Sequence, residues 1–162
     1  MHEFDLIREY FTWTSDEKSI ILGVGDDSAI CDFESGYQFV TSIDTLIEGV
    51  HFPQTTTAAD IAYKTLAVNL SDIAAMGALP KYFTLALTVP KIDQSWLKDF
   101  SHSLRALSEQ FGVSLIGGDT TKGPLSITIS IIGWVESGKA LHRSGAQIGD
   151  GIYVSNTIGD AA

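Results

Sequence analysis

Five aspartates stand where they could bind a metal ion. Each either adjoins a glycine at the end of an apolar strand pattern, follows an apolar run, or lies within an apolar helix pattern. Carboxylates that converge repel one another unless cations compensate their charge. Oxygen-only ligands favour Mg²⁺, which shares its coordination shell with substrate phosphates. With glycine-rich segments whose N–H groups can approach phosphate, the pattern indicates a magnesium–nucleotide site. The five are Asp26, Asp27, Asp44, Asp72 and Asp119.

Each of these aspartates also has a plainer interpretation. Asp after Gly at a strand end is often a turn residue. Asp72 lies in an apolar helix pattern, so it should be partly buried and should need a partner. With Thr65 and Asn69 it forms a polar stripe at i, i+4 and i+7. That stripe faces either solvent or a polar cleft.

Several common kinds of site are missing from the sequence. There is no Gly-x-x-x-x-Gly-Lys-Ser/Thr loop, and Gly23-Val24-Gly25 lacks the third glycine of a dinucleotide fingerprint. Zinc-type His/Cys spacing and a Gly-x-Ser-x-Gly motif are also absent. Cys31, the single cysteine, has an apolar setting typical of a core residue. Covalent hydrolases and standard phosphate loops are therefore disfavoured.

The charge balance excludes one class of partner. Acidic residues outnumber basic ones by 20 to 10, a formal charge of −10, so the basic surface that nucleic acid requires is missing. The excess acid serves either solubility or cation binding. The sequence contains no run of the roughly 18 apolar residues that are needed to span a membrane. Without a secretory-signal pattern, and with one cysteine, we expect a cytoplasmic protein.

The elements that hold these residues mix strands and helices without strict βαβ alternation, which predicts an α+β domain. Thr57 and Asp60 have capping-box spacing before a helix that runs to about Met76. Asp93 can cap a second helix, in which apolar residues from Leu97 to Phe111 follow helical spacing. A short helix is expected at residues 4–11 and a glycine-rich loop at 117–123. Strands are expected at residues 20–24, 29–33, 37–43, 82–89, 113–116, 125–135 and 151–155.

We predict two parts of unequal length. Residues 1–145 form an N-terminal domain that binds ATP and magnesium, and residues 146–162 begin a C-terminal domain that is cut short. The second expectation rests on residues 159–162, which resemble a loop entering a helix.

Four motifs, in order, resemble thiamine-monophosphate kinase, of the aminoimidazole ribonucleotide synthetase-like superfamily. The resemblance implies a mixed sheet flanked by helices, which pairs into a barrel across a homodimer. It also implies transfer of the γ-phosphoryl group of ATP to thiamine monophosphate, with several Mg²⁺ ions and no covalent nucleophile. The motifs are Gly25–Asp27, Asp44–Phe52, Ala67–Ala78 and Gly117–Gly123, and the likeness continues through Leu141–Ala146.

The resemblance also implies roles for individual residues. His51 matches a contact to the substrate, thiamine phosphate, and Asp26 shapes its loop. Ile43 stands where threonine is common, which is harmless if only its carbonyl binds metal and otherwise puts one metal site in doubt. The ATP contacts are Gly118, Asp119 and Arg143. The metal ligands are Asp27, Ser42, Ile43, Asp44, Asp72 and Asp119.

Other interpretations stay open from the sequence. His51 could be an ordinary loop histidine and Arg143 an ordinary surface arginine. The chain could be a dimerisation and nucleotide-binding module that is inactive alone. A selenophosphate synthetase-like enzyme would want a reactive Cys and Lys in an N-terminal glycine-rich segment, which this sequence lacks.

Overall fold

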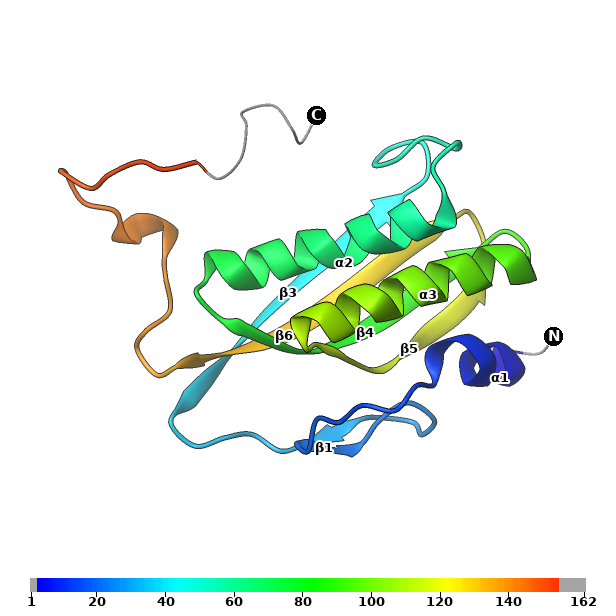
Figure 1. Ribbon diagram of the computed structural model, residues 1–162, viewed down its shortest axis with the longest axis horizontal. Helices are drawn as coiled ribbons and strands as arrows, with labels where there is room; N and C mark the ends of the chain where they lie inside the picture. The colour runs from blue at the N-terminus through cyan, green and yellow to red at the C-terminus, as the bar shows by residue number, and fades with distance from the viewer. Residues whose placement is uncertain (1–2, 155–162) are drawn as a thin grey trace.

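A four-stranded mixed sheet with two helices on one face forms the body of the protein (Figure 1). The computed structural model describes residues 3–154. β6 is antiparallel to both of its neighbours, whereas β4 and β5 are parallel. The predicted α+β fold with a mixed sheet flanked by helices is confirmed. In spatial order the strands are β3 (Tyr37–Ile47), β6 (Ser126–Glu136), β4 (Leu79–Val89) and β5 (Ser114–Lys122); the helices are α2 (Ala58–Ala75) and α3 (Gln94–Phe111).

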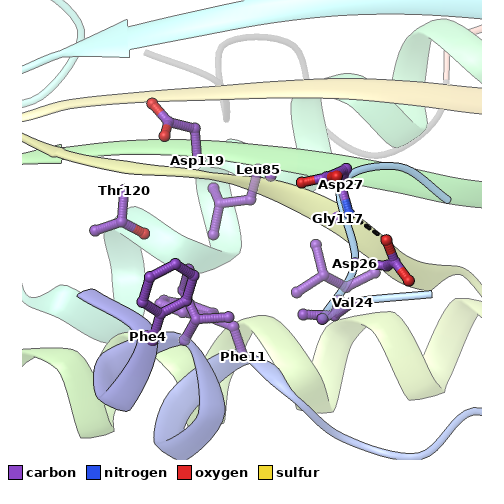
Figure 2. A pocket seen from close by; sticks show the side chains of 13 residues that line it. Phe4, Phe11, Val24, Asp26, Asp27, Leu85, Gly117, Asp119 and Thr120 are labelled. Atoms are coloured by element: carbon purple, nitrogen blue, oxygen red, sulfur yellow. Dashed lines mark hydrogen bonds between the residues drawn. The ribbon is translucent and has the colours of Figure 1, made fainter. Parts of the chain in front are cut away.

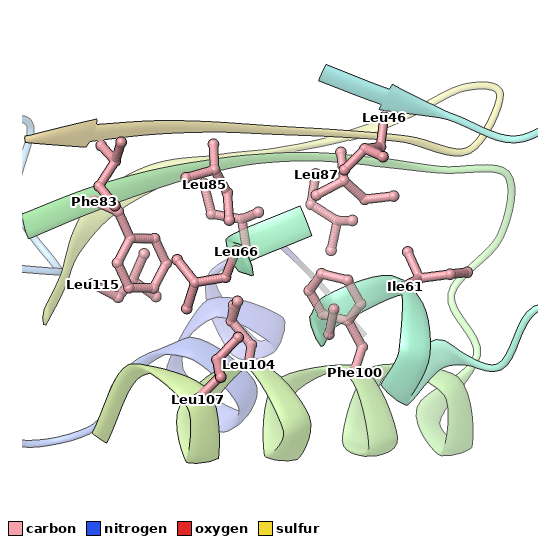
Figure 3. Packing of buried hydrophobic residues seen from close by; sticks show 14 of the residues in the cluster. Leu46, Ile61, Leu66, Phe83, Leu85, Leu87, Phe100, Leu104, Leu107 and Leu115 are labelled. Atoms are coloured by element: carbon pink, nitrogen blue, oxygen red, sulfur yellow. The ribbon is translucent and has the colours of Figure 1, made fainter. Parts of the chain in front are cut away.

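Alternation along β6 separates the core from the open face of the sheet. Ile127, Ile129 and Ile131 are fully buried and face the helices, while Thr128 and Ser130 between them point to the other face. Burying each such side chain contributes about 1.5–3 kcal/mol. Leucines and phenylalanines of β4, α2 and α3 complete this core (Figure 3).

Side-chain caps start both long helices, as the sequence predicts. The Thr57 hydroxyl accepts the N–H of Asp60 and donates to the Asp60 carboxylate, at 3.2 and 2.6 Å. The Asp93 carboxylate accepts the N–H groups of Ser95 and Trp96. These contacts satisfy N–H groups that have no partner within a helix.

The N-terminal segment adds smaller elements beside the sheet. α1 (Glu3–Leu6) continues into a π-helical turn, η1 (Ile7–Phe11). β1 (Ile20–Leu22) and β2 (Ile30–Cys31) form a separate antiparallel pair. Side chains of this pair pack against an aromatic cluster around Trp134, on the sheet face that the helices leave open.

Two strand boundaries near the predicted site differ from expectation. β3 extends to Ile47 because its pairing with β6 continues to that residue, so Asp44 lies inside the strand rather than at its end. Most of the expected loop 117–123 is also strand, since β5 pairs with β4 as far as Lys122. Asp119 is therefore a strand residue.

The segment after β6 is largely irregular. Arg143–Gly145 forms one 3-10 turn (η2), and residues 146–154 form neither helix nor strand. The expected strand at 151–155 is therefore wrong over residues 151–154, while its last residue and the expected loop at 159–162 lie outside the described part. The domain boundary at 145/146 stays a prediction. Within residues 3–154, no helix is long and apolar enough to cross a membrane.

Replacing the N-terminal cap of α2, the helix that carries Asp72, tests the capping role of Thr57. Thr57→Ala is expected to lower the free energy of unfolding by about 1 kcal/mol, because the N–H of Asp60 loses its acceptor. Thr57→Ser keeps the hydroxyl and serves as the matched control. Urea unfolding followed by circular dichroism measures both; equal stability of Thr57→Ala and the unaltered chain would contradict a capping role.

Candidate active site

A cavity of about 480 Å³ lies between the N-terminal helical turns, the loop after β1 and strand β5 (Figure 2). Its apolar wall includes Phe4 and Phe11, and its polar wall includes Asp27 and Asp119. The structure thus brings together two of the predicted metal ligands. The apolar wall was missed at the level of sequence, where the amphipathic pattern of residues 4–11 could have indicated it.

Asp26 lines the same cavity as Asp27, and its carboxylate also makes a contact within the loop. Asp26 Oδ1 accepts the backbone N–H of Asp27 at 2.8 Å, which closes the loop on itself (Figure 2). In this contact Asp26 shapes the loop, as expected. The backbone of Gly25 has a φ of 120°, a conformation open to glycine but strained for other residues.

Gly118 is required by the sheet itself. A Cβ atom at this position would lie 2.0 Å from the carbonyl oxygen of Leu85 on β4. At Gly117 the nearest neighbour, on Thr84, would be 4.0 Å away. The predicted ATP contact of Gly118 therefore has an independent structural reason, which is the close approach of two strands.

A second polar group lies on the other edge of the sheet, where β3 meets α2. The Ser42 hydroxyl donates to Asp72 Oδ2 at 2.5 Å. Asp44 shares the helix-facing side of β3 with Ser42 and the buried Leu46, since side chains alternate along a strand. Three predicted ligands thus come from neighbouring positions of two elements, whereas the Ile43 side chain points to the open face.

The polar stripe on α2 is not a single surface. Asp72 is exposed, so the expectation of partial burial is wrong: its helix position lies at the border between sheet and solvent. Thr65 and Asn69 are instead fully buried. The apolar residues next to Asp72 in the sequence therefore did not indicate the direction of its side chain.

The sheet order keeps the two acidic groups apart. β3 and β5 are opposite edges, three strand spacings apart, or about 14 Å. Within residues 3–154, no three His, Cys, Asp or Glu side chains form a group that could hold one metal ion. Mg²⁺ commonly uses one or two carboxylates together with waters and substrate phosphates. The donors on each edge therefore fit Mg²⁺ that is shared with phosphates, and a site using both must span the sheet.

His51 is held in a fixed orientation just after β3. The ring Nδ1 of His51 accepts the backbone N–H of Ile47 at 3.0 Å. The backbone N–H of His51 donates to the Ile47 carbonyl oxygen at 2.9 Å. Lys64 Nζ donates to the His51 carbonyl oxygen at 2.7 Å. An Nδ1 that accepts leaves the proton of a neutral imidazole on Nε2. His51 therefore offers one N–H donor to an anionic ligand.

Two other residues of interest lie away from these groups. Arg143 begins the exposed turn η2 and is not among the residues that line the cavity. Cys31 packs beside the Trp134 cluster, and burial, followed by the negative charges of Asp32 and Glu17, raises the pKa of its thiol. A raised thiol pKa disfavours the nucleophilic thiolate.

Comparison with known proteins places these motifs in one family. Residues 25–135 match the family described as AIR synthase related protein, N-terminal domain. The thiamine-monophosphate kinase of Haemophilus influenzae is 51% identical over the whole chain, which covers 50% of that relative. The chain spans about half the length of the curated relatives it matches.

Solved structures support the same relationship. The thiamine-monophosphate kinase of Stenotrophomonas maltophilia superimposes with a TM-score of 0.79 and 50% identity, over 83% of this chain and 43% of that one. A structure of AaThiL complexed with AMPPCP and TMP superimposes with a TM-score of 0.66 and 27% identity, over 75% and 39%. The family resemblance expected from the four motifs is confirmed.

A pair of glycine variants separates the structural role of Gly118 from ligand binding. Gly118→Ala is expected to lower the melting temperature by several degrees, because the new methyl group would displace the backbone of β4. Gly117→Ala has room for its methyl group and should change the melting temperature little. Differential scanning fluorimetry without nucleotide is the measurement; equal melting temperatures for the two variants would contradict the role assigned to Gly118.

Proposed function

Since the chain belongs to the AIR synthase related protein family and matches the N-terminal half of thiamine-monophosphate kinases, we propose that it supplies the ATP- and magnesium-binding part of such a kinase. The reaction is ATP-dependent phosphorylation of thiamine monophosphate to thiamine diphosphate. The observation that carries this proposal is the cavity where Asp27 and Asp119, from two matching motifs, lie together beside Gly117 and Gly118.

Electrostatics favours direct transfer of the γ-phosphoryl group. An anionic acceptor phosphate must approach anionic ATP, and the chain itself carries a formal charge of −10. Divalent cations between carboxylates and phosphates neutralise both reactants and hold them in line. Cys31, the single thiol, is disfavoured as a nucleophile by its raised pKa. The chemistry therefore consists of positioning and charge neutralisation.

The proposed roles follow the two edges of the sheet. Asp27 and Asp119 hold Mg²⁺ at the β5 edge, where the backbone of Gly118 contacts ATP. Arg143 is a further proposed ATP contact, from the turn η2 that lies away from this edge. His51, with its fixed Nε2–H, contacts the phosphate of thiamine monophosphate beyond the end of β3.

The β3 edge supplies the remaining metal ligands. Ser42, Asp44 and Asp72 hold Mg²⁺ there, and Ile43 contributes only its carbonyl oxygen. That backbone role makes the departure from threonine harmless, because every residue type carries the same carbonyl group.

We also propose that two copies of the chain pair through the open face of the sheet. Phe39, Ile43 and Ile47 project from β3 on this face with 64%, 65% and 40% of their surfaces exposed. The α2 and α3 helices cover only the opposite face. Thr41 and Thr45 alternate with these three side chains on the same face, so the row is partly apolar and partly threonine. A second copy presents the same row.

Binding and turnover together test the proposed function. The 162-residue chain is expected to bind Mg·AMPPCP weakly in calorimetry and to phosphorylate thiamine monophosphate slowly or not at all. Joined to the C-terminal half of the Haemophilus influenzae relative, it should form thiamine diphosphate from ATP. Failure to bind Mg·AMPPCP would overturn the proposal, whereas binding without turnover in both forms would leave a nucleotide-binding module.

One substitution on the open face tests the pairing. Ile43→Lys places a charge in the apolar row and should convert a dimer into a monomer, measured as molar mass by light scattering. Ile92→Lys, at an exposed isoleucine before α3, is the control and should stay dimeric. A monomeric unaltered chain, or a dimeric Ile43→Lys variant, would contradict pairing through this face.

A further inference from the structure

Asn69 is a buried polar side chain whose hydrogen bonding is incomplete. It lies on α2 with none of its surface exposed. Among the buried side-chain atoms of residues 3–154, its Oδ1 is the one without a hydrogen-bond partner. Buried polar groups are nearly always paired, and an exception calls for a physical reason.

The neighbouring contacts fix which end of the amide lacks a partner. Asn69 Nδ2 donates to the carbonyl oxygen of Thr65 at 2.9 Å. A carbonyl oxygen accepts but cannot donate, so the nitrogen must be on that side and the oxygen on the other. Thr65, one turn earlier, has its hydroxyl satisfied by the Ile61 carbonyl at 2.7 Å. Asn69 Oδ1 is therefore the atom on this face of α2 that lacks a partner, and its partner must be a hydrogen-bond donor or a cation.

The location of Asn69 follows from two contacts between α2 and the β3 segment. Lys64 bonds to His51, which lies beyond the end of β3, and Asp72 bonds to Ser42 in its middle. The helix therefore runs back along the strand.

Residue spacing then sets Asn69 beside the metal ligands. Asn69 precedes Asp72 by three residues, or about 4.5 Å of helix. Asp44 follows Ser42 by two residues, or about 6.6 Å of strand on the same face. Asn69 thus lies about level with Asp44 along the helix, and its full burial places it on the inner side of α2.

We propose that Asn69 is a positioning residue for a divalent cation at Asp44 and Asp72, and that its Oδ1 accepts a hydrogen bond from a water molecule carried by that cation. The inference rests on the proposed function, which supplies the cation. Mg²⁺ retains several waters when carboxylates bind it, and each such water is a strong donor. Asn69 has none of its surface exposed, so bulk water does not reach Oδ1 in the metal-free structure. Binding of the cation must therefore open space for its water beside this atom.

Asn69→Leu distinguishes this role from a purely structural one, because the two predict opposite effects. Leucine has a similar volume and removes the unpaired oxygen, so the metal-free protein should melt at the same or a higher temperature. Mg²⁺ affinity, measured by calorimetry with MgCl₂ alone, should weaken about 10- to 100-fold. A lower metal-free melting temperature together with unchanged Mg²⁺ affinity would overturn the proposal.

Matched variants locate the cause of any change. Thr65→Val removes a hydroxyl that is already satisfied by Ile61, and it should keep the Mg²⁺ affinity of the unaltered chain. Asn69→Asp keeps an oxygen acceptor, so Mg²⁺ should raise its melting temperature by more than it raises that of the unaltered chain. An equal or smaller rise would count against the proposal even if Asn69→Leu failed to fold.

Asp72→Asn separates this proposal from the proposed function. If the unaltered chain bound no Mg²⁺, or if Asp72→Asn bound it equally well, the magnesium site and the role of Asn69 would both fail. If Asp72→Asn weakened binding but Asn69→Leu did not, only the role of Asn69 would fail.

Discussion

The burial of three isoleucines on β6 fixes where the acidic residues lie. Ile127, Ile129 and Ile131 must face the helices, and a slip of one residue would expose all three. Because β6 pairs with both β3 and β4, its register determines which residues of these strands face the helices. Asp44 lies opposite Ile129 and therefore faces α2. The core thus positions a charged group that contributes nothing to the core itself.

The order of the strands in the sheet explains why the chain has two acidic groups rather than one. Sheet order places the cavity of Asp27 and Asp119 on one edge and the Ser42–Asp72 contact on the other. Carboxylates this far apart repel each other little, so the fold tolerates them without bound metal. The proposed transfer involves two phosphate-bearing ligands, ATP and thiamine monophosphate, and the two edges offer a separate group of oxygen donors for each.

Local signals in the sequence were sufficient for some features and not for others. The caps Thr57 and Asp93 act through residues two or three positions away, so their roles could be predicted. The strand character of Gly117–Lys122 depends on a parallel partner distant in sequence, and glycines there indicated a loop instead. The exposure of Asp72 depends on which side of α2 meets the sheet, which neighbouring residues do not report. The motifs were sufficient to predict a magnesium site. The position of their residues on two opposite edges of the sheet could be found only from the fold.

Paramagnetic mapping with Mn²⁺ in place of Mg²⁺ tests the central claim, that divalent cations bind at these two edges. In ¹⁵N–¹H spectra of the chain with AMPPCP, amide signals around Asp27 and Asp119 and around Asp44 and Asp72 should broaden first. Signals of the acidic residues Glu109 on α3 and Asp16 should persist. Broadening that follows all exposed carboxylates equally, or that spares both edges, would contradict the account.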